Sequence, residues 1–294
     1  MRRRTPRIAA VTMVRNEGAM LRRWVEHYGR QLGHDHLLVL DDSSDDGSTD
    51  DLGCAVQRVR PITGHFERQR MRIVSDAAAK LLRKHDAVVF ADADEFIVAD
   101  PERYDGLSAA VAAGRDRAAL GVLGLNVVHH AATEPALDLA RPLFEQRSLL
   151  KMIPLLCKPS VKLVSGPWAA GSHGLRGNTF AIDPGLYMFH LKFADRDHLM
   201  RVAEHRRAMV AQDGRAGETS WQFTGDEMVG LLDRITAGLT DPASVPEFSP
   251  APAALAKIVQ TFDNGVTRAT GRRQVQAMEA RPFRRIPARF AGVI

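Results

Sequence analysis

The chain of 294 residues contains only two cysteines, Cys54 and Cys157, and their spacing matches no metal-ligand pattern. This scarcity argues against a disulfide framework and favours a reducing cytoplasm. Long hydrophobic runs are also missing, since the longest one after the N-terminal region, residues 118–128, is too short to cross a bilayer. The apolar run 8–14 is interrupted at residues 15–17, and no small-residue cleavage site follows, so we expect no signal peptide. We therefore expect a cytoplasmic protein whose membrane contact, if any, is peripheral and at the inner face.

Charge is present but unevenly distributed. The formal net charge is +5 in a composition of 45% hydrophobic and 26% charged residues, which is ordinary for a globular protein. Basic residues gather at both ends, at Arg2, Arg3, Arg4 and Arg7 and at Arg268, Arg272, Arg273, Arg281, Arg284, Arg285 and Arg289. Such ends suit an anionic membrane surface or another acidic partner, and an arginine-rich solvated surface explains them equally well. We expect no nucleic acid partner, because no basic patch interleaved with aromatic residues is found.

The N-terminal half alternates between strand and helix patterns. Short apolar runs predict strands at residues 8–14, 37–40, 55–59 and 88–90. Apolar residues at helical spacing predict one helix carrying Trp24 and Tyr28 and a second helix over residues 67–84. This alternation predicts βαβ units, and therefore an α/β fold with a mixed, mainly parallel sheet flanked by helices.

The run VVFADADEFIV at residues 88–98 is the segment around which the chain is organised. Its apolar residues lead directly into Asp92, Asp94 and Glu95, and burying carboxylates is costly unless they are paired, hydrogen-bonded or bound to a metal. Open α/β sheets bind ligands at the carboxyl ends of their strands. We therefore predict that Asp92 and Asp94 hold a divalent cation, Mg²⁺ or Mn²⁺, and through it a diphosphate. An acidic surface turn is the alternative explanation of the same residues.

Beyond residue 100 the pattern is looser. Residues 118–128 and 186–193 predict strands, and residues 195–210 predict an amphipathic helix. The stretch 166–177 contains too many glycines for a regular element. Four prolines within residues 241–252 predict a linker, and a basic, helical C-terminal appendage is expected after it.

Four motifs occur in order in the first hundred residues. They are Arg15-Asn16-Glu17, Trp24-Val25-Glu26-His27-Tyr28, Asp41-Asp42-Ser43-Ser44-Asp45-Asp46-Gly47-Ser48 and Asp92-Ala93-Asp94-Glu95-Phe96. Together they resemble the family 2 glycosyltransferases, in the branch with an Arg-Asn-Glu start and an Asp-x-Asp-Glu-Phe motif. The resemblance covers residues 8–100 well and continues more weakly to about residue 210, through Gly171-Ser172-His173 and His190-Leu191-Lys192-Phe193.

The resemblance implies a GT-A, Rossmann-like fold and a metal-dependent enzyme of hexosyltransferase type. Such an enzyme moves a sugar from a nucleotide-diphospho-sugar, here expected to be a UDP-sugar, to a hydroxyl of a glycan, lipid or small molecule. Inversion at the sugar carbon and a role in polysaccharide or glycoconjugate biosynthesis are expected with it. The implied domain plan is a GT-A domain over 1–240, with a nucleotide-sugar half (8–100) and an acceptor half (101–240), followed by the linker and tail (241–294).

The same resemblance implies roles for individual residues. Asp42 would contact the base or ribose of the nucleotide, near Arg15 and Glu17. Asp92 would lie near the ribose and the metal, and Asp94 would ligate the metal.

Further candidates lie in the second half. His173 and His190 are candidate metal ligands, because Mn²⁺ accepts imidazole, but a loop histidine and a core histidine explain them as well. The candidate cations for the diphosphate are Lys158, Lys192, Arg68 and Arg70, and each is also explained as a surface cation. Trp168 is a candidate for stacking on an acceptor sugar or for packing in the core.

An inverting transferase needs a general base, and Asp226 and Glu227 are the candidates, with Asp195 and Asp197 as rivals. All four are also explained by the preference for acids at helix N-termini. Two other functions stay open: a nucleotidyltransferase, although a Gly-rich phosphate loop is missing after the first strand, and a non-catalytic nucleotide- or sugar-binding relative.

Overall fold

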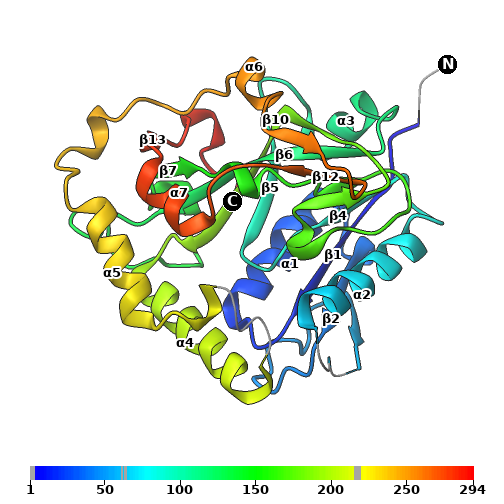
Figure 1. Cartoon of the computed structure of the whole chain (residues 1–294), viewed down its shortest axis with the longest axis horizontal. Coiled ribbons are helices and arrows are strands. Elements are labelled where there is room, and N and C mark those ends of the chain that lie inside the picture. The colour runs from blue at the N-terminus through cyan, green and yellow to red at the C-terminus, as the bar shows by residue number, and fades with distance from the viewer. Residues whose placement is uncertain (1–3, 61, 63–64, 215–219) are drawn as a thin grey trace.

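A ten-stranded sheet forms the centre of the molecule (Figure 1). The computed structural model describes residues 4–60, 62, 65–214 and 220–294. Eight strands follow the order β13-β7-β6-β8-β4-β1-β2-β3, and β10 joins through β6 and carries β5. Their bounds are β1 (Ile8–Val14), β2 (Leu37–Asp41), β3 (Ala55–Arg58), β4 (Ala87–Phe90), β5 (Glu95–Ala99), β6 (Ala119–Val128), β7 (Leu149–Met152), β8 (Val161–Lys162), β10 (Ala181–Phe193) and β13 (Arg284–Arg285).

The part of the sheet built from β3, β2, β1 and β4 is parallel throughout. Two of these strands, β1 and β4, are buried along their whole length, as their continuous apolar sequences predict. Antiparallel strands β8, β7, β13 and β5 complete the sheet. The predicted α/β class, a Rossmann-like sheet flanked by helices, is confirmed.

Helices cover both faces of the parallel part. They are α1 (Gly18–Leu32) and α2 (Phe66–Leu81). The remaining helices are α3 (Gly106–Ala113), α4 (Arg196–Asp213), α5 (Gly225–Thr236), α6 (Pro252–Leu255) and α7 (Gln274–Ala280). Successive residues of a strand point to opposite faces. In β1, Ala10 belongs to the apolar cluster that contains Trp24 of α1, whereas Val11 belongs to the cluster that contains Val74 of α2. The two predicted helices of the N-terminal half therefore pack on opposite faces of the sheet.

The run 88–98 is two strands with a tight turn between them. β4 ends at Phe90, and the Glu95 amide donates to the Asp92 carbonyl at 2.9 Å to close the turn. β5 then leaves in a new direction and pairs antiparallel with β10. The Leu191 amide of β10 donates to the Asp94 carbonyl at 2.8 Å, so both aspartates are held on a turn at the carboxyl end of β4.

The C-terminal segment differs from the predicted helical appendage, because it contains strands as well as α6 and α7. β11 (Val259–Thr261) and β12 (Val266–Ala269) form a three-stranded sheet with β9 (Gly174–Arg176), and β13 adds to the main sheet. The side chain of Phe290 is fully buried. Short pieces of this segment thus form strands by pairing with other strands, and these pairings are not visible in the tail sequence alone.

β9 also corrects the prediction of an irregular stretch at residues 166–177. Its glycine is required by the pairing, since a Cβ on Gly174 would lie 2.5 Å from the carbonyl oxygen of Thr267 in β12. Glycine therefore allows two backbones to approach closely here.

Two arginines of the basic C-terminal end form ion pairs within the fold. Arg289 forms a two-pronged ion pair with the buried carboxylate of Asp100, with distances of 2.8 and 2.9 Å. Arg285 lies 3.9 Å from Glu247. At the other end, Arg2 and Arg3 lie outside the described residues. In the described part of the chain, no helix combines the length and apolarity needed to cross a membrane.

Candidate functional site

A cleft of about 1230 Å³ opens at the carboxyl ends of β1, β2 and β4. One part of its wall is formed by residues 13–20, 42 and 92–95, which follow these strands, together with α2. Another part is formed by the loops 155–158 and 170–173 and by β10 and α4. The C-terminal segment contributes Arg268 and residues 273–276. This edge is where open α/β sheets bind ligands. The cleft brings together the N-terminal motifs and side chains from the second half of the chain.

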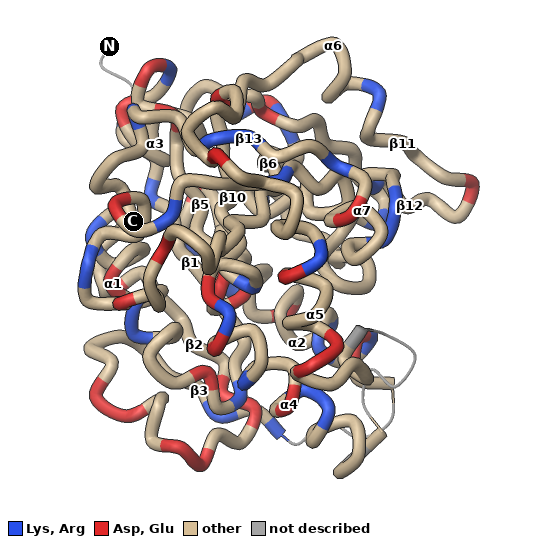
Figure 2. The backbone as a smooth tube through the Cα atoms, turned by 90° about the vertical axis from the view of Figure 1, so that its left-hand side faces the viewer, with Lys and Arg blue, Asp and Glu red and all other residues tan. Residues whose placement is uncertain are grey.

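The residues expected to bind the nucleotide line one end of this cleft. Asp42 is buried there, and its amide donates to the carbonyl of Val14 at 2.9 Å, which joins the ends of β2 and β1. Arg15 and Glu17 line the same end, and Arg15 donates to the side chain of Gln212 in α4 at 3.3 Å. Burial, with the nearby charge of Asp94, raises the pKa of Glu17 to about 7. Figure 2 shows the acidic segments that follow β2 gathered beside β2 and β3.

Asp94 is the more buried of the two aspartates on the turn. Its carboxylate lies 3.2 Å from Nε2 of His190 and 3.9 Å from the guanidinium of Arg206. Burial alone would raise its pKa, but His190 and Arg206 together hold the pKa of Asp94 well below its usual range. The carboxylate is therefore ionised at neutral pH.

Asp92 is more exposed and is paired with Arg70 of α2. Here too burial would raise the pKa of the carboxyl, and the opposing charges of Arg70 and Lys158 lower it. Arg70 also reaches Glu67 at 3.7 Å. The first carboxylate of the motif is thus held by the helix that precedes β4.

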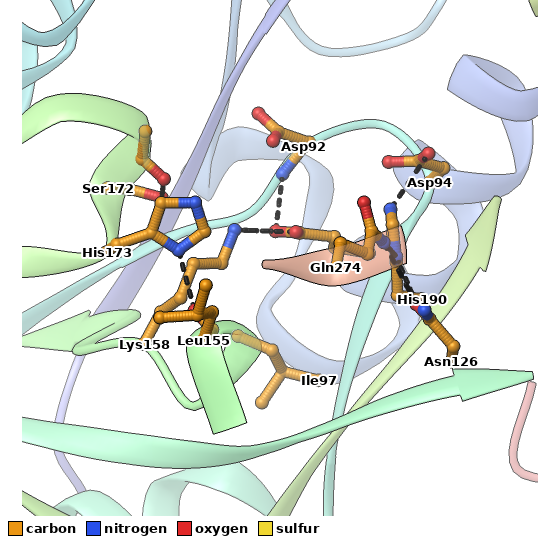
Figure 3. Close-up of polar contacts among 12 residues, drawn as sticks. Asp92, Asp94, Ile97, Asn126, Leu155, Lys158, Ser172, His173, His190 and Gln274 are labelled. Atoms are coloured by element: carbon orange, nitrogen blue, oxygen red, sulfur yellow. Dashed lines mark hydrogen bonds and ion pairs between the residues drawn. The ribbon is translucent and has the colours of Figure 1, made fainter. Parts of the chain in front are cut away.

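Glu95 and Lys158 form a buried ion pair beneath the turn (Figure 3). Nζ of Lys158 lies 2.5 and 2.7 Å from the two carboxylate oxygens, and both side chains are 2% exposed. The same carboxylate accepts a bond from the Asp92 amide at 3.2 Å. Lys158, a predicted diphosphate cation, is therefore used to support the turn.

His190 is engaged on both ring nitrogens (Figure 3). Nε2 faces Asp94, and Nδ1 lies 2.6 Å from the side-chain oxygen of Asn126, whose amide nitrogen lies 3.0 Å from the sulfur of Met278. Gln274 approaches the same ring at 3.4 Å. His190 holds Asp94 in place, and neither ring nitrogen is left open toward the cleft.

His173 has the opposite arrangement. Nδ1 donates to the Leu155 carbonyl at 2.7 Å, and burial next to Lys158 lowers the pKa of His173 to about 4. The ring is therefore neutral, with its lone pair on Nε2. Figure 3 shows that nitrogen on the side of the ring that faces Asp92. A ligating histidine in a metal site has this form, with the other nitrogen fixed by a carbonyl.

The oxygen and imidazole donors of this cleft suit Mg²⁺ or Mn²⁺ in type. Among the described residues, however, no three His, Cys, Asp or Glu side chains are already clustered as a metal site. Asp92, Asp94 and His173 line the same cleft, and the open lone pair of His173 fits a metal ligand. The two carboxylates are balanced by Arg70, His190 and Arg206 in this structure.

A cationic wall faces the turn. Arg206 of α4 lies over the ring of Trp221 at 5.4 Å and reaches Asp94. Lys192 of β10 also lines the cleft, and burial together with the charge of Arg206 lowers its pKa to about 7. Other basic residues along this wall are His198, Arg201, His205, Arg268 and Arg273.

Most residues of this wall were not predicted from the sequence to lie at the site. A signal was present in α4, because His198, Arg201 and His205 are spaced to share one face of a helix. No comparable signal exists for Arg268, Arg273 and Gln274, which reach the cleft only through the folding of the C-terminal segment.

Several predicted site residues lie elsewhere. Trp168 is buried, packs on Phe90 and donates from its indole nitrogen to the Pro159 carbonyl at 2.9 Å, so its surroundings are those of a core residue. Arg68 lies on the exposed side of α2, in a second, smaller hollow. The cleft lining does not include either of them.

The candidate bases all lie at helix N-termini in this structure. Glu227 forms a capping box with Thr224 at the start of α5, and Asp226 follows the same cap. Asp195 caps α4 through the His198 amide at 2.8 Å, and Asp197 follows in the first turn. None of the four is among the residues that line the cleft.

No protein-family model matches the chain, and the search of curated proteins found no match either. Matches among solved structures include the following two. One is the mannosyltransferase PcManGT from Pyrobaculum calidifontis in complex with GDP-Man and Mn²⁺, with 20% identity and a TM-score of 0.30 over 44% of this chain. The match spans 37% of the length of that mannosyltransferase. The other is mannose-1-phosphate geranyltransferase from Thermus thermophilus, with 13% identity and a TM-score of 0.28, covering 94% of this chain and 75% of the other.

Proposed function

We propose that this protein transfers a sugar from a nucleotide-diphospho-sugar to a hydroxyl group of an acceptor. The observation that carries the proposal is that one cleft at the carboxyl edge of the parallel strands brings Asp42, Asp92 and Asp94 together with many basic residues. A nucleotide-sugar has the matching chemistry, with hydroxyl groups that carboxylates bind and a diphosphate that cations and metals bind. We propose a UDP-sugar as the donor and inversion as the outcome.

The roles proposed for the site residues follow from their positions. Asp42, Arg15 and Glu17 would hold the nucleoside at the end of β1 and β2. Asp92, Asp94 and His173 would hold a divalent metal, which stabilises the negative charge that develops on the leaving diphosphate. Arg70 and Lys158 fix the turn on which these aspartates stand.

In the proposed reaction the bond between the sugar carbon and the phosphate oxygen breaks, and its electron pair leaves with the nucleoside diphosphate. The acceptor oxygen bonds to the same carbon, and its proton passes to a base. Asp226 and Glu227 remain the bases predicted from the sequence. That role requires Asp226→Ala to lower kcat with donor affinity unchanged, and a normal kcat would remove Asp226 from the mechanism.

The proposal is tested by thermal unfolding of the protein with UDP, GDP, CDP, ADP and dTDP, each with and without Mn²⁺. Binding to the folded state stabilises it by roughly 2.7 kcal/mol when the ligand is a hundredfold above its Kd. We expect one diphosphate to raise the melting temperature and to need the metal. No shift with any of the five would contradict the proposed donor class.

Turnover is tested separately, by release of the nucleoside diphosphate from the corresponding sugar nucleotide in the presence of candidate acceptors. NMR of the product's anomeric proton then decides between inversion and retention. Tight donor binding without release in any acceptor series would favour a non-catalytic sugar-nucleotide-binding protein.

A further inference from the structure

Four lysines of this protein are almost fully buried: Lys151, Lys158, Lys162 and Lys192. Three of them have a protein partner for the ammonium group. Lys158 is paired with Glu95, Lys151 donates to the Met278 carbonyl at 2.6 Å, and Lys162 donates to the Gly166 carbonyl. Lys192 is different, because its ammonium has no hydrogen bond or ion pair with any residue that the structure describes.

Lys192 is 5% exposed and lines the cleft. It lies two residues after His190 on β10, and both side chains line the cleft. The nearest charged groups that act on it are Arg206, which repels it, and Asp94, which attracts it. Asp94 is already bonded to His190 and within reach of Arg206, so its charge is shared among cations.

A largely buried ammonium group that keeps only the water of the cleft and gains no compensating bond is costly, and the lowering of the Lys192 pKa to about 7 reflects that cost. Of the four buried lysines, only Lys192 has no hydrogen bond or ion pair to a described residue, and Lys192 lines the cleft. Such an arrangement is expected where the missing partner is a ligand.

We propose that Lys192 is a substrate-binding residue whose ammonium group contacts an oxygen of the donor's diphosphate. This inference rests on the function proposed above, and it assigns the anion-binding role to Lys192 in place of Lys158. A compact ammonium on a flexible stem is a common phosphate ligand, since it meets a phosphate oxygen as a point charge. Asp92 and Asp94 serve the same diphosphate from the opposite wall, through the metal.

The experiment compares wild type, Lys192→Met and Lys192→Arg by titration calorimetry with UDP, UMP and inorganic pyrophosphate, each in Mn²⁺ and in EDTA. We expect Lys192→Met to weaken binding of UDP and of pyrophosphate at least tenfold and UMP much less. Lys192→Arg keeps the charge and should retain a measurable part of the affinity.

The same variants are measured without ligand. Since Lys192→Met removes an unpaired buried charge, we expect the free protein to melt at a higher temperature than wild type. Lys151→Met is the matched control: an equally buried lysine with a carbonyl partner outside the cleft. It should lower the melting temperature and leave UDP affinity unchanged in the folded fraction.

The outcomes separate this inference from the proposed function. If wild type and Lys192→Met bind UDP equally, Lys192 does not contact the diphosphate although the nucleotide site exists. Binding of pyrophosphate that depends on Lys192, with no binding of any nucleoside diphosphate, would keep the phosphate contact and remove the nucleotide-sugar function. A marked fall in the melting temperature of unliganded Lys192→Met would show that the ammonium has a structural partner, and would overturn the inference.

Discussion

The two walls of the cleft differ in how their charges are held. On the wall built from the strand ends, each carboxylate of the turn is tied to a named side chain: Asp92 to Arg70, Asp94 to His190 and Glu95 to Lys158. On the wall built from β10, α4 and the C-terminal segment, the buried ammonium of Lys192 has no such partner among the described residues. The carboxylates of the first wall are therefore already paired within the protein, whereas the ammonium group of Lys192 on the second wall is left to interact with a ligand.

This difference explains why buried charges in the same cleft have different expected roles. A paired buried charge supports the fold, and removing its partner leaves an uncompensated charge behind. An unpaired buried charge lowers the stability of the free protein and raises its affinity for an anion. Substitutions on the two walls should therefore change stability in opposite directions.

The largest effect is expected on the carboxylate wall, for Asp94→Ala. This change removes the proposed metal ligand and leaves His190 and Arg206 without their shared partner, so turnover should fall more than about 100-fold. Steady-state assays with Mn²⁺ measure the loss, and circular dichroism checks the fold. Asp233→Asn, at an exposed ion pair with Arg196, is the control. Unchanged turnover in Asp94→Ala would remove the metal site from the proposal.

Lys158→Met tests the supporting pair beneath the turn. Because it leaves Glu95 buried and unpaired, the free energy of unfolding should fall by about 3 kcal/mol, measured by urea denaturation. The double variant Lys158→Met, Glu95→Gln should recover part of that loss, since the uncompensated charge is gone. If the free energy of unfolding falls no more in Lys158→Met than in Lys192→Met, the proposed difference between the two walls is wrong.

Behind the cleft, His27 gives the expected pH dependence of stability. Burial between α1 and β5 lowers the pKa of His27 to about 4, and the nearby charges of Arg30 and Arg23 act in the same direction. The Ile97 carbonyl, 3.0 Å from Nε2, opposes this lowering in part. The unfolded chain takes up a proton near pH 6.5 and the folded chain only near 4, so stability is lost as the pH falls through this window.

The loss attributed to His27 is on the order of 2 kcal/mol between pH 7 and pH 4. His27→Gln cannot titrate, so its unfolding free energy should depend less on pH over the same range. Urea denaturation at several pH values measures both proteins. Equal slopes would mean that His27 is charged in the folded state or does not contribute.

The smallest effect is expected for His173→Ala. It removes the open lone pair but neither carboxylate, so the affinity for Mn²⁺ in the presence of UDP should fall about tenfold. Nucleotide affinity measured in EDTA should stay the same. An unfolded variant, or unaltered metal dependence in a folded one, would place His173 among the residues that only support the loop.

The N-terminal half was largely predictable because its signals are local. Continuous apolar runs gave β1, β2 and β4 near their observed ends, and the acids after β4 were expected at a strand end. In the second half, β6, β10 and α4 were found at approximately the right positions. The tail was not, because β11, β12 and β13 are strands only through their pairing with β9 and β7.

Individual residues illustrate the same limit at the site. Lys158 and Lys192 have the same side chain, and the sequence made both candidates for the diphosphate. Only the packing of β10 against β5 and β6 decides that one ammonium meets Glu95 and the other lines the cleft without an ion pair or hydrogen bond among the described residues. The role of Trp168 also depends on tertiary structure, because Phe90 and Lys162 pack against its ring.

The amino-acid order alone determined the strand and helix periods of the first hundred residues and placed carboxylates directly after the strands. Those features depend on neighbours in sequence, through hydrophobic periodicity and turn chemistry. Which charges are paired, which are left for a ligand and which distant segments close the cleft were decided by tertiary structure. The physical reason is that the energy of a buried charge depends on its surroundings in space, and those surroundings come from residues far apart along the chain.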